Sequence, residues 1–134
     1  MPNWLIGLYL LHVFAALYWL GSTYLVAQRK GVGAERQYRY QMVAATLTML
    51  LGGFLWGQMH RFGVGKMEVV LGLGALAAIG AAGVQGLLVG GSIRRLRNGQ
   101  LDEPKARARI RAGNRWAAVL LAVALLAMVG SYHV

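Results

Sequence analysis

The order of apolar and polar positions divides the chain into four long apolar stretches, at about residues 4–27, 41–59, 69–91 and 114–133. A helix that crosses a bilayer needs ~20 predominantly apolar residues. The first and third stretches exceed that length, the second is slightly short, and the fourth reaches it only if the residues from Gly130 onward complete the crossing. The pattern therefore predicts an all-α, integral membrane four-helix bundle that forms one domain over residues 1–134.

Composition supports a membrane protein and removes several kinds of chemistry. The chain is 57% hydrophobic and 13% charged, against roughly 25% charged residues in a typical soluble domain. It has no cysteine, which excludes disulfides and thiolate chemistry. It also lacks a phosphate-binding loop, a nucleophile elbow and an HExxH motif. The four acids, Glu35, Glu68, Asp102 and Glu103, lie in the connections, which argues against proton-coupled drug efflux through a buried carboxylate.

The distribution of charge predicts the orientation. Lys and Arg number 14 against four acids, a net charge of +10. All the Lys and Arg residues except Arg61 and Lys66 lie in the connections 28–41 and 92–115. Short loops rich in Lys and Arg stay in the cytoplasm, so both termini are expected outside, in a multi-pass protein of a bacterial cytoplasmic (inner) membrane. We interpret the basic segments as topology signals attracted to anionic headgroups, and expect no nucleic-acid partner.

Glycines and one helix-start signal refine the picture. Gly53 and Gly57 form a GxxxG pair in the second stretch, and Gly86 and Gly90 form another in the third. Such pairs favour close helix packing in lipid, although they can also leave room for a flat, bulky group between helices. The segment 102–104 combines two acids with a proline, which predicts that the last helix begins there, in the cytoplasm.

Three histidines are the candidates for chemistry. His12 lies inside the first stretch, ~12 Å from its outer end by helical rise, whereas His60 and His133 lie at the outer boundary. An ionisable group within a membrane helix is a functional candidate, although a hydrogen bond to a neighbouring helix can also explain a neutral imidazole. A haem needs a histidine on its iron, and Cu(I) suits imidazole and thioether ligands. The metal-ligand candidates are His12, Met59, His60, Met67 and His133.

The first stretch resembles a known group of bacterial membrane proteins. Residues 11–22 contain His12 followed by small residues and then Trp19 and Gly21. This is similar to the opening helix of copper-resistance protein D-like domains and of the bacterial four-helix, haem-containing protoporphyrinogen oxidase. The resemblance implies a haem site to which His12 and Trp19 belong. It also implies ligation by a lysine of the third helix, for which Lys66 is the counterpart.

The sequence leads to one main functional hypothesis and two alternatives. The main one is a protein that binds haem b or copper in the outer half of the bilayer, for electron transfer, porphyrinogen oxidation or copper handling. Whether it is an enzyme, such as a haem-dependent oxidoreductase, stays open. The first alternative is a non-catalytic subunit or assembly factor of a larger membrane complex, or a homo-oligomer. The second is a transporter or channel, with a thin polar lining from Thr46, Thr48, Gln58 and Gln85.

Overall fold

The computed structural model describes residues 2–29, 33–59 and 65–131, and these residues are almost entirely helical. The elements, in chain order, are α1 (Asn3–Gln28), α2 (Ala34–Met59), α3 (Lys66–Val84), η1 (a π-helical segment, Gln85–Gly90), α4 (Gly91–Arg97) and α5 (Glu103–Ser131). Because α3, η1 and α4 follow one another without a break, the chain forms four long helical runs. The predicted all-helical, four-helix architecture is thus confirmed.

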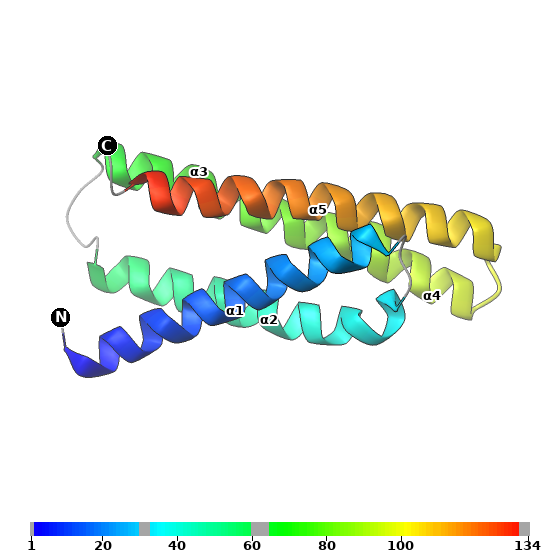
Figure 1. Ribbon diagram of the computed structural model, residues 1–134, viewed down its shortest axis with the longest axis horizontal. Helices are drawn as coiled ribbons and strands as arrows, with labels where there is room; N and C mark the ends of the chain where they lie inside the picture. The colour runs from blue at the N-terminus through cyan, green and yellow to red at the C-terminus, as the bar shows by residue number, and fades with distance from the viewer. Residues whose placement is uncertain (1, 30–32, 60–64, 132–134) are drawn as a thin grey trace.

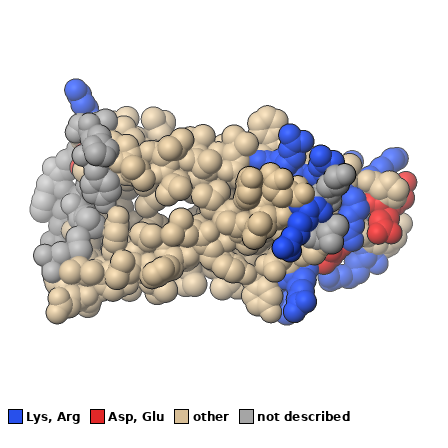
Figure 2. All heavy atoms as spheres, viewed as in Figure 1, with Lys and Arg blue, Asp and Glu red and all other residues tan. Residues whose placement is uncertain are grey.

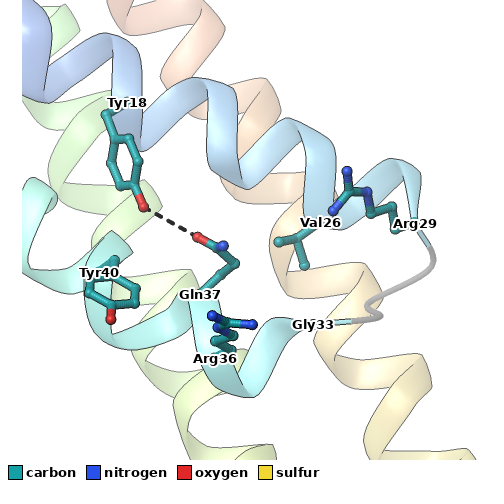
Figure 3. Close-up of a pocket in the computed structure, with 7 residues that line it drawn as sticks. All are labelled: Tyr18, Val26, Arg29, Gly33, Arg36, Gln37 and Tyr40. Carbon is teal, nitrogen blue, oxygen red and sulfur yellow. Dashed lines mark hydrogen bonds between the residues drawn. The ribbon is translucent and has the colours of Figure 1, made fainter.

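The four runs are arranged as two antiparallel pairs. Helix α3 packs along α5, and α1 packs along α2, while α2 and α3 touch only briefly. Figure 1 shows α3 and α5 as one layer above α1 and α2. Between α1 and α2, the Tyr18 hydroxyl donates to Gln37 Oε1 at 3.3 Å (Figure 3).

Local signals set the ends of the helices. Helix α5 begins at Glu103, and the Asp102 carboxylate accepts a hydrogen bond from the Lys105 amide at 3.1 Å. That is the N-cap interaction, and it confirms the predicted start of the last helix. After α4, Gly99 has a φ of +72°, and the amides of Gly99 and Gln100 donate to the carbonyls of Leu96 and Arg95. This is the Schellman motif, which needs a residue such as glycine in the left-handed region.

The core occupies the middle and one end of the bundle. One cluster joins all four helical runs through Trp19, Ala44, Ala45, Ala81, Ala117 and Leu121. A second cluster, nearer the connections 30–32 and 98–102, contains Val26, Ala34, Val89, Ile93 and Ile110. Small alanine side chains let the backbones approach closely, which is the main source of helix association in lipid. Figure 2 shows an opening between the two layers in the half of the molecule away from the basic end.

The glycines that make close contacts are mostly not those of the predicted GxxxG pairs. A Cβ added at Gly53, Gly57 or Gly86 would meet nothing within 4 Å, so the prediction that these pairs pack helices together is wrong at three of its four positions. The close approaches fall at Gly74, where a Cβ would lie 2.9 Å from Ala127 Cβ, and at Gly113, 2.8 Å from Val89 Cγ2. Both positions bring α5 against the α3–η1 run.

Three runs are long and apolar enough to cross a membrane: α1, the continuous run Lys66–Arg97, and α5. Among the described residues, α2 is not one of these runs. Many large apolar side chains face outward, with Leu87 81% and Leu126 71% exposed. The Lys and Arg side chains gather at the end that carries α4 and the start of α5 (Figure 2).

Candidate functional site

His12 lies in the half of the bundle away from the basic end, on the face of α1 that packs against α2. Its side chain is only 6% exposed. A Cβ added at Gly52 of α2 would lie 3.0 Å from His12 Cε1, so the absence of a side chain at Gly52 makes room for the imidazole.

The imidazole of His12 has one nitrogen without a protein partner. The ring interacts with the backbone of Thr48, whose hydroxyl is itself engaged with the Ala44 carbonyl at 2.7 Å. The buried Nδ1 atom of His12 makes no hydrogen bond with any residue that the structure describes. Because buried polar atoms are nearly always paired, this nitrogen is the strongest sign of a ligand-binding atom in the described part of the bundle.

Trp19, the second residue that the resemblance points to, is engaged in a different interaction. Its indole N–H donates to Gln85 Oε1 at 2.6 Å. The Gln85 amide in turn donates to Thr23 Oγ1 at 2.9 Å and to Asn114 Oδ1 at 3.4 Å. All four side chains are fully buried. They form a polar network that joins α1, η1 and α5, so the Trp19 N–H is already used inside the protein.

The π-helical segment η1 brings Gln85 to the centre of this network. Segments of this type are rare and often lie at functional sites. Here Gln85 is the first residue of η1 and points into the bundle, and Gly90 is the last. A Cβ at Gly90 would collide with the Tyr38 hydroxyl of α2, so the end of η1 is packed directly beneath an aromatic ring of α2. The segment η1 thus contacts α2 as well as α1 and α5.

Gln41 is a second buried polar side chain without partners. It is 0% exposed, and neither end of its amide bonds to a residue in the described segments. It lies one turn before Ala44 and Ala45, the α2 residues that pack against Trp19. Sequence reasoning singled out neither Gln41 nor the full network. The available signal was the presence of Trp19, Thr23, Gln85 and Asn114 within otherwise apolar stretches.

Only some of the other predicted ligands belong to the described residues, and those lie at helix ends. Lys66 is an exposed residue at the first position of α3, and Met67 beside it is half-buried. Met59 is the last residue of α2, and His60 and His133 lie outside the described residues. Across residues 2–29, 33–59 and 65–131, no group of three His, Asp or Glu side chains is close enough to hold a metal ion.

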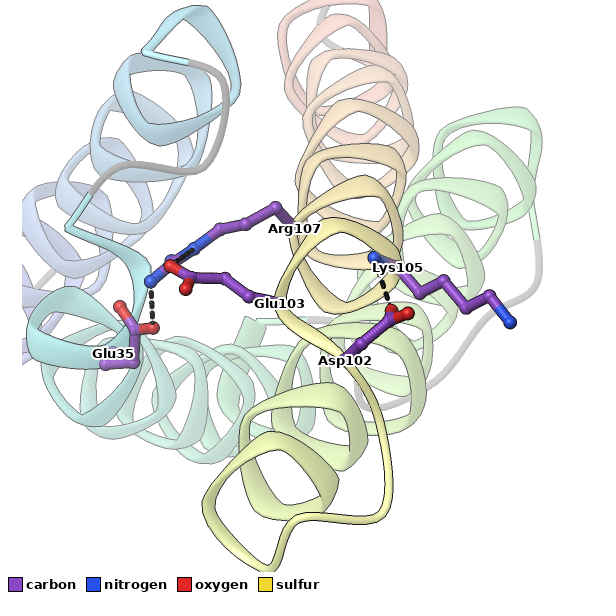
Figure 4. A network of polar contacts seen from close by, with 5 residues as sticks. All are labelled: Glu35, Asp102, Glu103, Lys105 and Arg107. Atoms are coloured by element: carbon purple, nitrogen blue, oxygen red, sulfur yellow. Dashed lines mark hydrogen bonds and ion pairs between the residues drawn. The ribbon is translucent and has the colours of Figure 1, made fainter.

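The basic end carries an ion pair that connects two helices. Arg107 of α5 lies 2.6 Å from the Glu35 carboxylate of α2 and 3.9 Å from Glu103 (Figure 4). Burial alone would raise the pKa of Glu35, but the hydrogen bond and charge of Arg107 outweigh it and lower that pKa below its ordinary value. Since both partners are about a third exposed, the pair contributes modestly to stability.

Comparison of the chain with protein-family models, with curated proteins and with solved structures finds no match.

Proposed function

We propose that the chain is an integral protein of a bacterial cytoplasmic membrane that binds haem b through His12 in the outer half of the bilayer. In this proposal the basic end lies in the cytoplasm, both termini lie outside, and α2 forms the fourth crossing within the bundle. The role is one-electron transfer or porphyrinogen oxidation. The observation that carries the proposal is the buried, unpartnered Nδ1 of His12.

The membrane part of the proposal is supported by the surface of the molecule. Apolar side chains cover the lateral faces of three spans, while Lys and Arg gather at one end (Figure 2). Such a one-sided distribution of basic residues is typical of the cytoplasmic side. The lower hydropathy of α2 fits a helix that packs against α1 and touches the end of η1, where Tyr38 lies against Gly90.

The donor set favours haem over copper. A haem can be held by a single protein imidazole, and one buried imidazole nitrogen is what the described residues offer. A Cu(I) site needs two or three converging soft ligands, and the candidates Met67 and Lys66 lie at the end of α3 rather than beside His12. Copper handling therefore remains the weaker version of the proposal.

Each residue near the site has a distinct role in this proposal. His12 would hold the haem through its imidazole, and the interaction of the ring with the Thr48 backbone would orient it, as second partners of ligating histidines usually do. Gly52 leaves the space that the ring occupies. Trp19 fixes α1 through Gln85 and is a positioning residue. Haem, when bound, supplies reversible one-electron chemistry.

A second candidate function is favoured by one observation on α2. This helix is not apolar enough to count as a span by composition, and Thr46 on it is exposed. A neighbouring membrane protein that packs on α2 would cover Thr46, as expected if the chain is a non-catalytic subunit or assembly factor. Isolation of the chain as part of a stable larger complex, colourless and without metal, would favour this function.

The test of the main proposal is an absorption spectrum of the full chain purified in mild detergent. We expect a Soret band that His12→Ala abolishes and that added imidazole restores, because a folded variant keeps the space of the lost ring. His60→Ala and His133→Ala are matched controls that should keep the band. A colourless wild-type protein, or a band that survives His12→Ala, would overturn the assignment.

The orientation is tested separately. Because the chain has no cysteine, Asn3→Cys and Gln100→Cys each introduce a single thiol at opposite ends of the bundle. A membrane-impermeant maleimide applied to spheroplasts should label the thiol at position 3 and should label that at position 100 only after lysis. The reverse pattern would show that the basic end faces outward.

A further inference from the structure

A pocket at the basic end lies between the last turns of α1 and the first turns of α2. Its volume is about 380 Å³, within the range of small-molecule sites. Arg29 and Arg36 line it from the two helices, together with Gln37, Val26 and the rings of Tyr18 and Tyr40. In Figure 3, Arg36 extends from α2 toward α1, and the head of Arg29 turns back toward the same space.

Among the residues that the structure describes, the two arginines of this pocket have no acidic partner. The chain has four acids, and each is engaged elsewhere: Glu35 and Glu103 with Arg107, Glu68 with the Gly65 amide, and Asp102 with the Lys105 amide. No ion pair of the described residues involves Arg29 or Arg36. The pocket therefore holds uncompensated positive charge, on side chains whose planar donor groups match the oxygens of a phosphate.

A third donor points to the same type of ligand. The Tyr18 hydroxyl donates to Gln37 Oε1, which leaves the amide N–H groups of Gln37 as donors. Tyr18 and Tyr40 are about half exposed, and tyrosines with an apolar body and a polar tip are typical of the level of the headgroups. Val26 closes the pocket on its apolar side.

Exposed apolar side chains run from this pocket toward the other end of the bundle. On α2 they recur at spacings of three and four, which places them on one helical face: Tyr40, Val43, Leu47, Leu50 and Phe54. On α1 the corresponding residues are Leu10, Phe14, Leu17 and Tyr18. A ligand with a phosphate at one end and hydrocarbon at the other fits both the basic pocket and these apolar faces.

We propose that Arg29, Arg36 and Gln37 form a discrete binding site for the phosphate headgroup of an anionic phospholipid, whose acyl chains lie along α1 and α2. The inference rests on the membrane part of the proposed function and is independent of haem binding. It goes beyond general attraction of basic loops to a charged surface, because it assigns the headgroup to one pocket and not to the larger basic band of α4 and α5.

The test titrates the full chain in non-ionic detergent with short-chain phosphatidylglycerol and measures the retained lipid by native mass spectrometry. The pocket variant is Arg29→Gln with Arg36→Gln. The control is Arg94→Gln with Arg95→Gln, which removes the same charge from exposed positions on α4. Loss of two charge-assisted contacts should weaken binding at least about tenfold in the pocket variant, and the control should remain close to wild type.

Further arms separate the sources of the phosphate. Short-chain phosphatidylcholine tests the need for net negative charge, and glycerol phosphate and inorganic phosphate test the need for acyl chains. Equal loss in both double variants, or equal binding of phosphatidylcholine, would overturn a discrete anionic site. Equal affinity for glycerol phosphate would overturn the assignment to a lipid. The Soret band should be unchanged in all variants, so failure here is distinguishable from failure of the haem proposal.

Discussion

Replacement of Gln85 by Leu removes the residue through which α1, η1 and α5 are hydrogen-bonded to one another. Three side-chain bonds are lost: from Trp19 Nε1 at 2.6 Å, to Thr23 Oγ1 at 2.9 Å and to Asn114 Oδ1 at 3.4 Å. Side-chain hydrogen bonds between membrane helices average about 0.6 kcal/mol, and buried bonds in water-soluble proteins about 0.5–1.5 kcal/mol. The expected loss in the free energy of unfolding is therefore about 2–4 kcal/mol.

A double-mutant cycle isolates the shortest of these bonds. Trp19→Phe removes the indole N–H but also leaves a cavity, and the cycle with Gln85→Leu cancels that packing loss. We expect a coupling energy of about 0.6–1.5 kcal/mol, measured by reversible unfolding in mixed micelles followed by far-ultraviolet circular dichroism. Additivity of the two single substitutions within about 0.3–0.5 kcal/mol would refute the claim that this bond joins the helices.

The other predictions concern three contacts. Gln41→Leu should leave the free energy of unfolding unchanged or raise it, because both ends of that buried amide lack partners in the described structure. A loss in the free energy of unfolding above about 1 kcal/mol would contradict this. Gly90→Ala should destabilise by about 1–3 kcal/mol by forcing Tyr38 away, and Tyr38→Phe in the same chain should recover part of the loss, as thermal unfolding can check. The Glu35–Arg107 pair should add under about 1 kcal/mol at neutral pH, where the carboxyl is charged in both states. That contribution should vanish as the pH falls past the ordinary pKa of Glu35 and through its lowered value, and should be absent at every pH in Glu35→Gln.

The sequence predicts the helices well because their causes are local. These signals act within a few residues of the chain. The acids and proline at 102–104 lie where α5 begins, and Gly99 lies just after the end of α4. Helix contacts depend on which faces meet, and that is not local. The GxxxG spacing therefore identified one close approach, at Gly90, and missed those at Gly52, Gly74 and Gly113, whose surroundings come from distant parts of the chain.

The candidate site was predictable in part. His12 stands out in the sequence because an imidazole inside an apolar helix is costly, whereas its contact with Gly52 depends on which helix faces meet. The partners of Trp19 could not be derived from the sequence either. Gln85, which accepts from its indole, lies 66 positions away along the chain.

The two halves of the bundle are held together differently. In the middle and at the basic end, two core clusters, the Gln85 network and the Glu35–Arg107 pair hold the four runs against one another. In the half away from the basic end, the two layers leave an opening (Figure 2), and the His12 imidazole lies against Gly52 within the α1–α2 pair. Regions held by fewer buried contacts are the ones that open locally. A group bound at His12 would stabilise the less constrained half by mass action, and the constrained half would keep the imidazole in register while the group enters and leaves.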